Sequence, residues 1–356
     1  MKYSSIEPFL FLYITEKCQL RCKHCYMGDR LDMERHMSLE TIEDILSSLK
    51  TLYGQYKVYL LGGEPTLHPD FFDILELCKK YDYKVVVTSN GLLPNRFWEK
   101  LTENKNYIDS FSFSFDGGNP DSHEFMRGKN TFTPLIKSMK EAVSFGFQSR
   151  VIYTVTTKNI QHVPEAIDLA EEIDVEMISF HYFTPTGLGK HRSDLQVGPD
   201  QWMDFCNYLQ QESPKRNISI FYPPAFIRND QAHILENYGY RGCTARNLER
   251  LAIFPDRRVY ICSAFFDSDL HYGTFENGSI IPRFEKDNEL ALVGSVAQSC
   301  RKCPNSAFCK AGCAAYDYFE HTYPTKECDQ EVIPICPLWS MPAEKESIKD
   351  SLYVLR

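Results

Sequence analysis

Several features that would assign a chain to other protein classes are missing from this sequence. No stretch approaches the ~18 consecutive apolar residues that a membrane-spanning helix needs. The opening residues, MKYSSIEPFLFLYITEKC, contain an apolar run, but Glu7 and the lack of a small-residue cleavage site argue against a secretion signal. We therefore expect a protein with no membrane contact and a cytoplasmic location.

Clusters of basic residues are also missing. The chain has 39 Lys and Arg against 48 Asp and Glu, which gives a formal net charge of -9. Proteins that bind nucleic acids neutralise phosphates with gathered Lys and Arg side chains. The charge pattern thus argues against nucleic acid as the main partner. Internal repeats and low-complexity segments are absent as well.

Cysteine, by contrast, is abundant, with 13 residues in the chain. In a reducing compartment cysteines serve metal binding more often than disulfides. Cys78, in an apolar helical stretch, and Cys206 stand alone, and we expect both to be buried as small hydrophobic residues. The remaining cysteines form two groups, one near each end of the chain.

Over the first two thirds of the chain, strand-like apolar runs alternate with longer amphipathic stretches. The runs cover residues 9–15, 57–62, 84–89, 108–115, 150–155 and 175–183. Helices are predicted at 38–53, 70–81, 94–103, 132–145, 162–172 and 199–213. Some begin with a polar cap, such as Ser38. This alternation predicts an α/β fold of parallel strands with right-handed crossovers, and its six units suit a partial (β/α)6 barrel.

The alternation ends near residue 215. LAIFPDRRVYIC at 251–262 then predicts a hairpin that turns at Asp256-Arg257. A cysteine-dense tail follows. We expect residues 1–220 to form the barrel, 221–242 a linker region and 243–356 a second, cysteine-rich domain.

Cys18, Cys22 and Cys25 follow the first predicted strand with the spacing C-x3-C-x2-C. Loops at the carboxyl ends of barrel strands are where sites gather. Three thiolates can hold a [4Fe-4S] cluster while one iron keeps no protein ligand. An open metal position can meet a substrate. Zinc is the alternative, but it wants a fourth ligand, and we expect His24 to be unable to turn inward.

This loop resembles the cluster loop of the radical S-adenosylmethionine (SAM) enzymes. GGEPTL at 62–67 resembles the family motif that engages the amino group of SAM, and its glycines permit close backbone approach. TSNG at 88–91 and SFSFDG at 112–117 resemble the strand ends that hold the ribose and carboxylate of SAM. HEFMRG at 123–128 resembles a stretch common in peptide-modifying members. Taken singly, each of these polar residues could also serve ordinary turns.

The resemblance implies a cofactor and a set of contacts. SAM would bind to the open iron of the cluster, accept an electron and split to a 5'-deoxyadenosyl radical that takes a hydrogen atom from the substrate. Reduced flavodoxin or ferredoxin would supply the electron. The implied SAM contacts are Gly62, Gly63, Glu64, Pro65, Ser89, Asn90, Ser114 and Asp116.

The tail spells C-x2-C-x5-C-x3-C and resembles the SPASM extension of radical SAM enzymes, which carries two auxiliary [4Fe-4S] clusters, so the chain would hold three in all. The resemblance implies one cluster on Cys300, Cys303, Cys309 and either Cys336, which we prefer, or Cys328, and another on Cys243, Cys262 and Cys313. The latter either takes Cys328 as well or has an open iron. A zinc ribbon confined to the tail is the alternative.

Three classes of function follow. Most SPASM relatives modify a peptide or protein side chain by crosslinking, thioether formation or oxidation, so a peptide maturase is the main hypothesis. The same chemistry on a small molecule, such as sugar or amino acid dehydrogenation or epimerisation, is the second. A non-catalytic electron-transfer protein is the third, disfavoured by GGEP. With 17 residues before Cys18, we expect leader recognition to come from another protein or the barrel surface.

A proton acceptor or hydrogen donor is also expected near the substrate. The late barrel strands offer Tyr153, His181, Tyr182 and Arg150. Each could instead be a core or rim residue, because one face of such a strand is always buried. The sequence names no catalytic residue among them.

Overall fold

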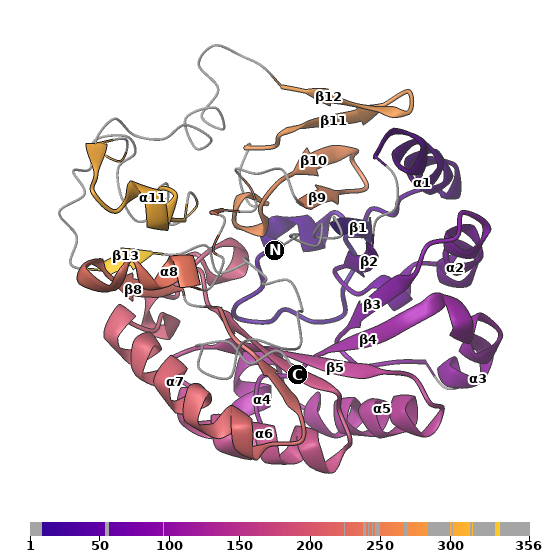
Figure 1. Ribbon diagram of the computed structural model, residues 1–356. Helices are drawn as coiled ribbons and strands as arrows, with labels where there is room; N and C mark the ends of the chain where they lie inside the picture. The colour runs from indigo at the N-terminus through magenta and orange to yellow at the C-terminus, as the bar shows by residue number, and fades with distance from the viewer. Residues whose placement is uncertain are drawn as a thin grey trace.

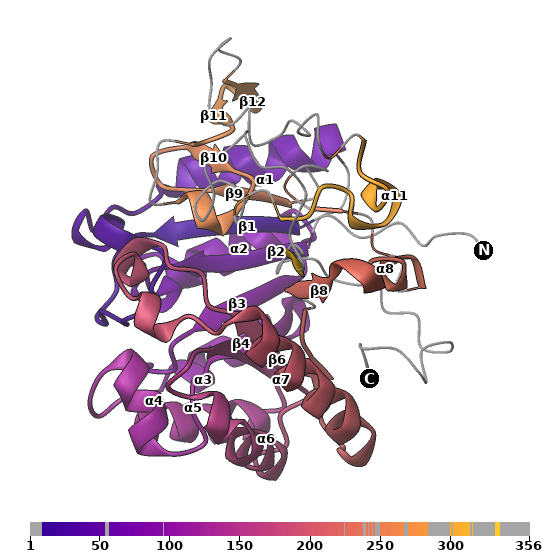
Figure 2. The same cartoon turned by 90° about the vertical axis from the view of Figure 1, so that its left-hand side faces the viewer.

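The computed structural model describes residues 9–53, 57–94, 96–223, 225–237, 240, 242–243, 245, 250–266, 270–283, 300, 302–313, 315 and 332–334. Its centre is a curved sheet whose outer face is covered by helices (Figures 1 and 2). The strand order is β12-β11-β10-β9-β1-β2-β3-β4-β5-β6-β7, and a second sheet pairs β8 with β13. The predicted α/β barrel is confirmed.

The parallel strands follow the chain order from β1 to β7. They are β1 (Phe9–Thr15), β2 (Lys57–Gly62), β3 (Val85–Ser89), β4 (Ile108–Ser114), β5 (Ser149–Val155), β6 (Met177–Tyr182) and β7 (Ser219–Phe221). All six predicted strands are present with ends within two residues. The short β7 pairs in parallel with β6 and was not predicted, because three residues are too few for a periodic pattern.

Helices connect the strands along the outside of the sheet. They are α1 (Leu39–Tyr53), α2 (Phe71–Lys80), α3 (Phe97–Leu101), α4 (Pro120–Arg127), α5 (Phe132–Ser144), α6 (Val163–Glu172) and α7 (Pro199–Glu212). Ser38 caps α1 as predicted, since its Oγ accepts a hydrogen bond from the backbone N–H of Thr41 at 3.2 Å. The polar α4 was missed, although Asn119 caps it by accepting from the N–H of Ser122.

Side-chain alternation in β1 shows how the sheet is buried on both faces. Leu10, Leu12 and Ile14 are fully buried on one face, toward the helices. Phe9, Phe11 and Tyr13 alternate with them and line the barrel interior. Both faces of a parallel sheet are buried, so the sequences of its strands are nearly continuous apolar runs.

The predicted hairpin at 251–262 is confirmed. β9 (Arg250–Ile253) and β10 (Arg258–Tyr260) pair antiparallel, and Arg257 in the turn has a φ of 63°. β9 also pairs in parallel with β1, so the sheet continues from the barrel into the later region. The predicted linker at 221–242 lies in the chain that connects β7 to β9.

The remaining described elements are short. β11 (Gly273–Glu276) and β12 (Ser279–Pro282) extend the sheet beyond β10, while β8 (Phe226–Arg228), β13 (Val332–Pro334), α8 (Ile234–Asn237) and α11 (Ser306–Cys309) gather beside the open side of the barrel (Figure 1). Among the described residues, no helix has the length and apolarity to cross a membrane. Cys78 and Cys206 are both buried, as predicted.

Candidate active site

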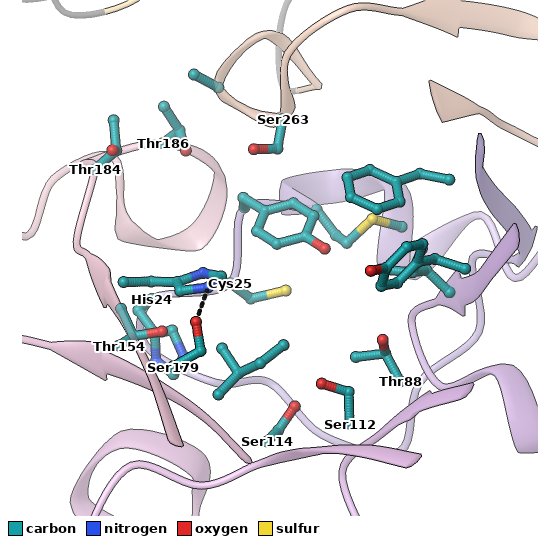
Figure 3. A pocket seen from close by; sticks show the side chains of 18 of the residues that line it. His24, Cys25, Thr88, Ser112, Ser114, Thr154, Ser179, Thr184, Thr186 and Ser263 are labelled. Carbon is teal, nitrogen blue, oxygen red and sulfur yellow. Dashed lines mark hydrogen bonds between the residues drawn. The ribbon is translucent and has the colours of Figure 1, made fainter. Parts of the chain in front are cut away.

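The barrel encloses a cavity of about 470 Å³. Its wall carries Cys18, Cys22 and Cys25 from the loop after β1, and Cys243, Cys262 and Cys313 from the later region. Polar residues at the strand ends complete it. In Figure 3, Ser112 and Ser114 lie across the cavity from Ser263. The two cysteine groups, far apart in the sequence, therefore face one space.

The front cysteines lie in a tight loop at the mouth of the cavity. The N–H of Cys25 donates to the carbonyl of Cys22 at 3.1 Å, and the Sγ of Cys18 accepts from the N–H of Leu20 at 3.4 Å. Burial raises the pKa of the Cys18 thiol to about 11 and that of Cys25 to about 12, and the neighbouring cysteines add to both shifts. Thiols that burial and mutual repulsion keep protonated become ligands when a metal replaces the proton.

The donor set fits an iron–sulfur cluster better than a single ion. In the described part of the chain, no three His, Cys, Asp or Glu side chains converge as they would around one metal ion. A cubane cluster instead takes each thiolate on a different iron, so its sulfurs need not meet at one point. Three thiols on a cavity wall match a cluster with one iron open to the cavity.

The glycines of GGEP let β2 and the cysteine loop approach each other. The N–H of Gly63 donates to the carbonyl of Thr15 at 2.9 Å, and the N–H of Glu64 donates to that of Lys17 at 2.8 Å. A Cβ on Gly63 would lie 2.5 Å from the Lys17 carbonyl oxygen and 2.7 Å from the Cβ of Cys18. Only glycine fits between these backbones, and this explains its position beside the loop.

Glu64 is 1% exposed and lies on the cavity wall. Its Oε1 accepts from the N–H and hydroxyl of Thr66 and from the Ser89 hydroxyl, while within the described part of the chain Oε2 accepts only from the N–H of Asn90, at 2.7 Å. Burial raises the pKa of this carboxyl, and the hydrogen bonds oppose that rise. The Oε2 atom keeps a free lone pair that could accept from an ammonium group.

The predicted SAM contacts divide into two sets. Gly62, Gly63, Glu64, Ser89, Asn90 and Ser114 all line the cavity. Pro65 and Asp116 do not belong to that lining. Asn90 also reaches the cysteine loop, since its Nδ2 lies 3.8 Å from the Cys18 sulfur.

Asp116 instead lies outside the cavity lining and contacts residues that do line the cavity. Its fully buried carboxylate forms an ion pair with Arg127 Nε at 2.6 Å, lies 3.3 Å from His24 Nε2 and accepts from the N–H of Thr154. Burial raises the pKa of this carboxyl, but the Arg127 charge outweighs it and holds the pKa below its usual value. Arg127 in turn points Nη1 at the Cys22 sulfur, 3.9 Å away. The contacts from Asp116 to Arg127 and from Arg127 to Cys22 thus connect the loop after β4, α4 and the cysteine loop.

The expectation that His24 cannot turn inward was wrong. Its ring lines the cavity, and burial lowers its pKa to about 4. Inside the barrel, its Nε2 lies 3.3 Å from the buried Asp116 carboxylate. Arg127, the last residue of α4, belongs to the HEFMRG stretch, but the sequence assigned it no role, because the sequence alone does not show its contact with Cys22.

A buried ion-pair network anchors the cysteine loop on its other side. Glu16, with no exposed surface, pairs with Arg30 at 2.9 Å and Arg35 at 2.6 Å. Arg30 also pairs with Asp256 in the β9–β10 turn at 3.1 Å. The loop is therefore fixed to the hairpin. The two segments are far apart in the sequence, so no local sequence pattern predicts this contact.

The described rear cysteines lie in two places. Cys243, Cys262 and Cys313 line the cavity, whereas Cys300, Cys303 and Cys309 do not. In the second set, burial raises the pKa of Cys309 and the nearby Cys303 and Cys300 raise it further. The described cysteines form no disulfide. Cys328 and Cys336 lie outside the described residues.

The four expected hydrogen donors or proton acceptors occupy different places. His181, Arg150 and Tyr182 line the cavity, with the Tyr182 hydroxyl donating to the carbonyl of Val197. Tyr153 is fully buried and donates to the carbonyl of Asn159, so it belongs to the core. The inward-facing Tyr13 and Tyr26, whose hydroxyls are 3.0 Å apart, were missed.

Fold and site together define an α/β barrel enzyme with a cysteine-lined cofactor cavity. Comparison with known proteins makes this more specific, since residues 12–170 match the model of the Radical SAM superfamily. Those residues constitute a radical SAM domain. The resemblance drawn from the front loop and GGEP is thereby confirmed.

Curated relatives cover different shares of the chain. The mycofactocin maturase MftC of Mycolicibacterium smegmatis is 25% identical over 350 residues, which is 94% of this chain and 84% of that protein. The Fe-coproporphyrin III synthase of Methanosarcina barkeri is 22% identical over 69% of this chain, and the chain spans only 61% of its length.

Solved structures share the fold. Streptococcus suis SuiB bound to precursor peptide SuiA matches with a TM-score of 0.70 and 20% identity, over 92% of this chain and 76% of that one. The structure of anSMEcpe with bound AdoMet and the Cp18Cys peptide matches with a TM-score of 0.66 and 20% identity, over 90% of this chain and 92% of that one.

Proposed function

We propose that this chain is a SPASM-type radical SAM enzyme that modifies a side chain of a ribosomally made peptide or of a protein. The observation that carries the proposal is the single cavity lined by both cysteine groups. A SAM-binding site alone needs only the front group. Rear cysteines on the same wall would hold a second redox centre beside the substrate, and such a centre would suit an oxidation that removes electrons from the substrate.

In this proposal, Cys18, Cys22 and Cys25 hold the SAM-binding cluster, while Cys243, Cys262 and Cys313 hold the nearer auxiliary cluster. Cys300, Cys303 and Cys309 hold the distal one with Cys336 or Cys328. Bound there, the front cluster and SAM would supply an organic radical that takes a hydrogen atom from the substrate. Ferredoxin or flavodoxin would provide the electron.

The chain's own residues bind and orient the cofactor. Glu64 Oε2 would accept the SAM ammonium, and the backbone around Gly62 and Gly63 permits the close approach. Arg127 would hold the cysteine loop against Asp116. The apolar part of the wall excludes water, which protects a reactive radical from quenching.

A peptide substrate is supported by the relatives. The match to MftC covers 94% of this chain, and SuiB was solved with its precursor peptide. A small-molecule substrate is the second candidate, favoured by the match to Fe-coproporphyrin III synthase, but that match leaves out about a third of this chain. The longer alignment supports the peptide.

The test is release of 5'-deoxyadenosine from SAM by anaerobically reconstituted protein under reducing conditions. Wild type should release it, and a variant with Cys18, Cys22 and Cys25 replaced by Ala should not. Cys78→Ala, a buried thiol away from the cavity, is the matched control and should retain release. Mass spectrometry of candidate peptides then identifies the substrate, and product formation only with small molecules would refute the peptide assignment.

A further inference from the structure

Arg250 is a charged side chain on the cavity wall that belongs neither to the proposed SAM contacts nor to the cysteine loop. Arg250 begins β9 beside Phe9 of β1, and only 5% of its surface is exposed. It lines the cavity together with Cys243 and Cys262. Its guanidinium carbon lies 5.2 Å from the centre of the Phe11 ring, which gives the cation an aromatic surface on one side.

The other charged residues of the described cavity wall already have partners. Glu64 accepts four hydrogen bonds, as described above. Arg127 pairs with Asp116 at 2.6 Å, and Arg150 pairs with Glu176 at 3.4 Å. Positive charge therefore exceeds negative charge on this wall, with three arginines and one glutamate.

Arg250 differs from the other two arginines. Its Nη2 donates one hydrogen bond, to the carbonyl of Ile261 at 3.2 Å. Its Nε is buried and has no hydrogen-bond partner among the residues that the structure describes. No acidic side chain among the described residues forms an ion pair with it.

A buried cation without an anion is costly, so such a group is ordinarily paired. The guanidinium presents five donors in a planar fork that matches a carboxylate through two parallel hydrogen bonds. Because Arg250 lines the cavity, an anion that completes its pairing can arrive with the substrate. The Phe11 ring covers one face of the guanidinium, so an anion would meet the N–H groups at its edge.

We propose that Arg250 is a specificity-determining residue that binds a carboxylate of the substrate inside the cavity. The carboxylate belongs either to an acidic side chain or to the C-terminus of the peptide. The inference rests on the proposed function, because it presumes that the substrate occupies this cavity. It places the anchored group on the side of Cys243 and Cys262.

The competing anion is the rear thiolate group. Burial raises the pKa of the Cys262 thiol, and the Arg250 charge and a side-chain hydrogen bond between Arg250 and Cys262 oppose that rise, so the two groups are in direct contact. If Arg250 paired only with the thiolates of the auxiliary cluster, replacing it would change the properties of that cluster. The preference for a carboxylate ligand over its amide would stay the same. The experiment separates these two roles.

The probes are small carboxylates and their neutral matches, bound to the anaerobically reconstituted protein in the presence of SAM. N-acetyl-phenylalanine against N-acetyl-phenylalaninamide represents a chain terminus. N-acetyl-glutamate α-amide against N-acetyl-glutaminamide represents an acidic side chain. Calorimetry measures each Kd. We expect the carboxylate of at least one pair to bind wild type ~tenfold or more tightly than its amide.

Arg250→Gln should abolish that preference, and Arg250→Lys should keep part of it, since Lys retains the charge but not the fork. Arg150→Gln is the matched control, because this arginine lines the same cavity but already has a carboxylate partner; it should keep the preference. Iron content, melting temperature and the electron paramagnetic resonance spectrum of the reduced clusters report on the state of each variant.

Equal binding of carboxylate and amide by wild type would overturn the proposal, even if Arg250→Gln failed to fold. A preference that survives in Arg250→Gln would overturn it as well. A changed cluster spectrum in Arg250→Gln with an unchanged preference would assign the guanidinium to the cluster instead. Probe binding needs no radical chemistry. Lack of 5'-deoxyadenosine release would therefore refute the proposed function, but the Kd values of the carboxylate and amide probes could still be compared.

Discussion

Replacing Gly63 with Ala should uncouple the SAM site from the cysteine loop. The new Cβ would lie 2.5 Å from the Lys17 carbonyl oxygen, where ordinary contacts begin at 3.4 Å. Neither neighbour is the end of a flexible side chain, because one is backbone and the other is the Cβ of Cys18. The loop must therefore move by roughly 1 Å, a displacement that can lower a reaction rate about 100-fold.

The assay for Gly63→Ala combines stability, cofactor content and turnover. Overpacking of this kind costs about 1–3 kcal/mol, which should lower the melting temperature by several degrees. We expect 5'-deoxyadenosine release to fall ~100-fold or more, with loss of iron if the loop opens. Gly198→Ala is the matched control, because Gly198 has a φ of -69° and nothing within 4 Å of its missing Cβ.

The reasoning fails if Gly63→Ala releases 5'-deoxyadenosine at the wild-type rate and keeps its iron. It also fails if Gly198→Ala loses activity to the same extent, since the effect would then come from any added methyl group. A lower melting temperature with unchanged turnover would show that the contact matters to stability alone.

Two further changes test the parts of the site separately. Glu64→Gln keeps the shape but removes the charge, and equilibrium dialysis should show SAM binding weakened ~tenfold or more, whereas unchanged affinity would remove Glu64 from the ammonium site. Arg30→Ala leaves the buried Glu16 with one partner fewer and should lower the free energy of unfolding by about 3 kcal/mol in urea titrations, against ~0–1 kcal/mol for the control Arg21→Ala, whose pair with Asp32 is exposed. Equal effects of the two arginine variants would contradict the anchoring role of Arg30.

Much of the fold was predictable because it is encoded locally. The apolar runs gave the six strands, and the cap at Ser38 fixed the start of α1. The turn at Asp256-Arg257 followed from its two flanking runs. What failed were short elements: β7 has three residues, and α4 has a polar sequence without an apolar stripe.

The candidate site was predictable as far as its residue types matched known motifs. Cys18, Glu64 and Asn90 lie on one cavity wall, as the order of the strand ends implied. The network of Asp116, Arg127 and His24 was not predictable, because its members come from different elements and meet only in the folded chain.

The position of Arg250 on the cavity wall was also not predictable from the sequence. In the sequence it is one basic residue before an apolar strand, a pattern found at many exposed strand ends. Only the parallel pairing of β9 with β1 brings it into the barrel.

The most direct measurement is the iron content of the anaerobically reconstituted protein and its spectrum with and without SAM. The account predicts that replacing Cys18, Cys22 and Cys25 with Ala removes about four iron atoms per chain, and that SAM changes the spectrum of wild type but not of the variant. Equal iron content in the two proteins would contradict the account. So would a wild-type spectrum that SAM does not change because a fourth side chain already binds the open iron of the front cluster.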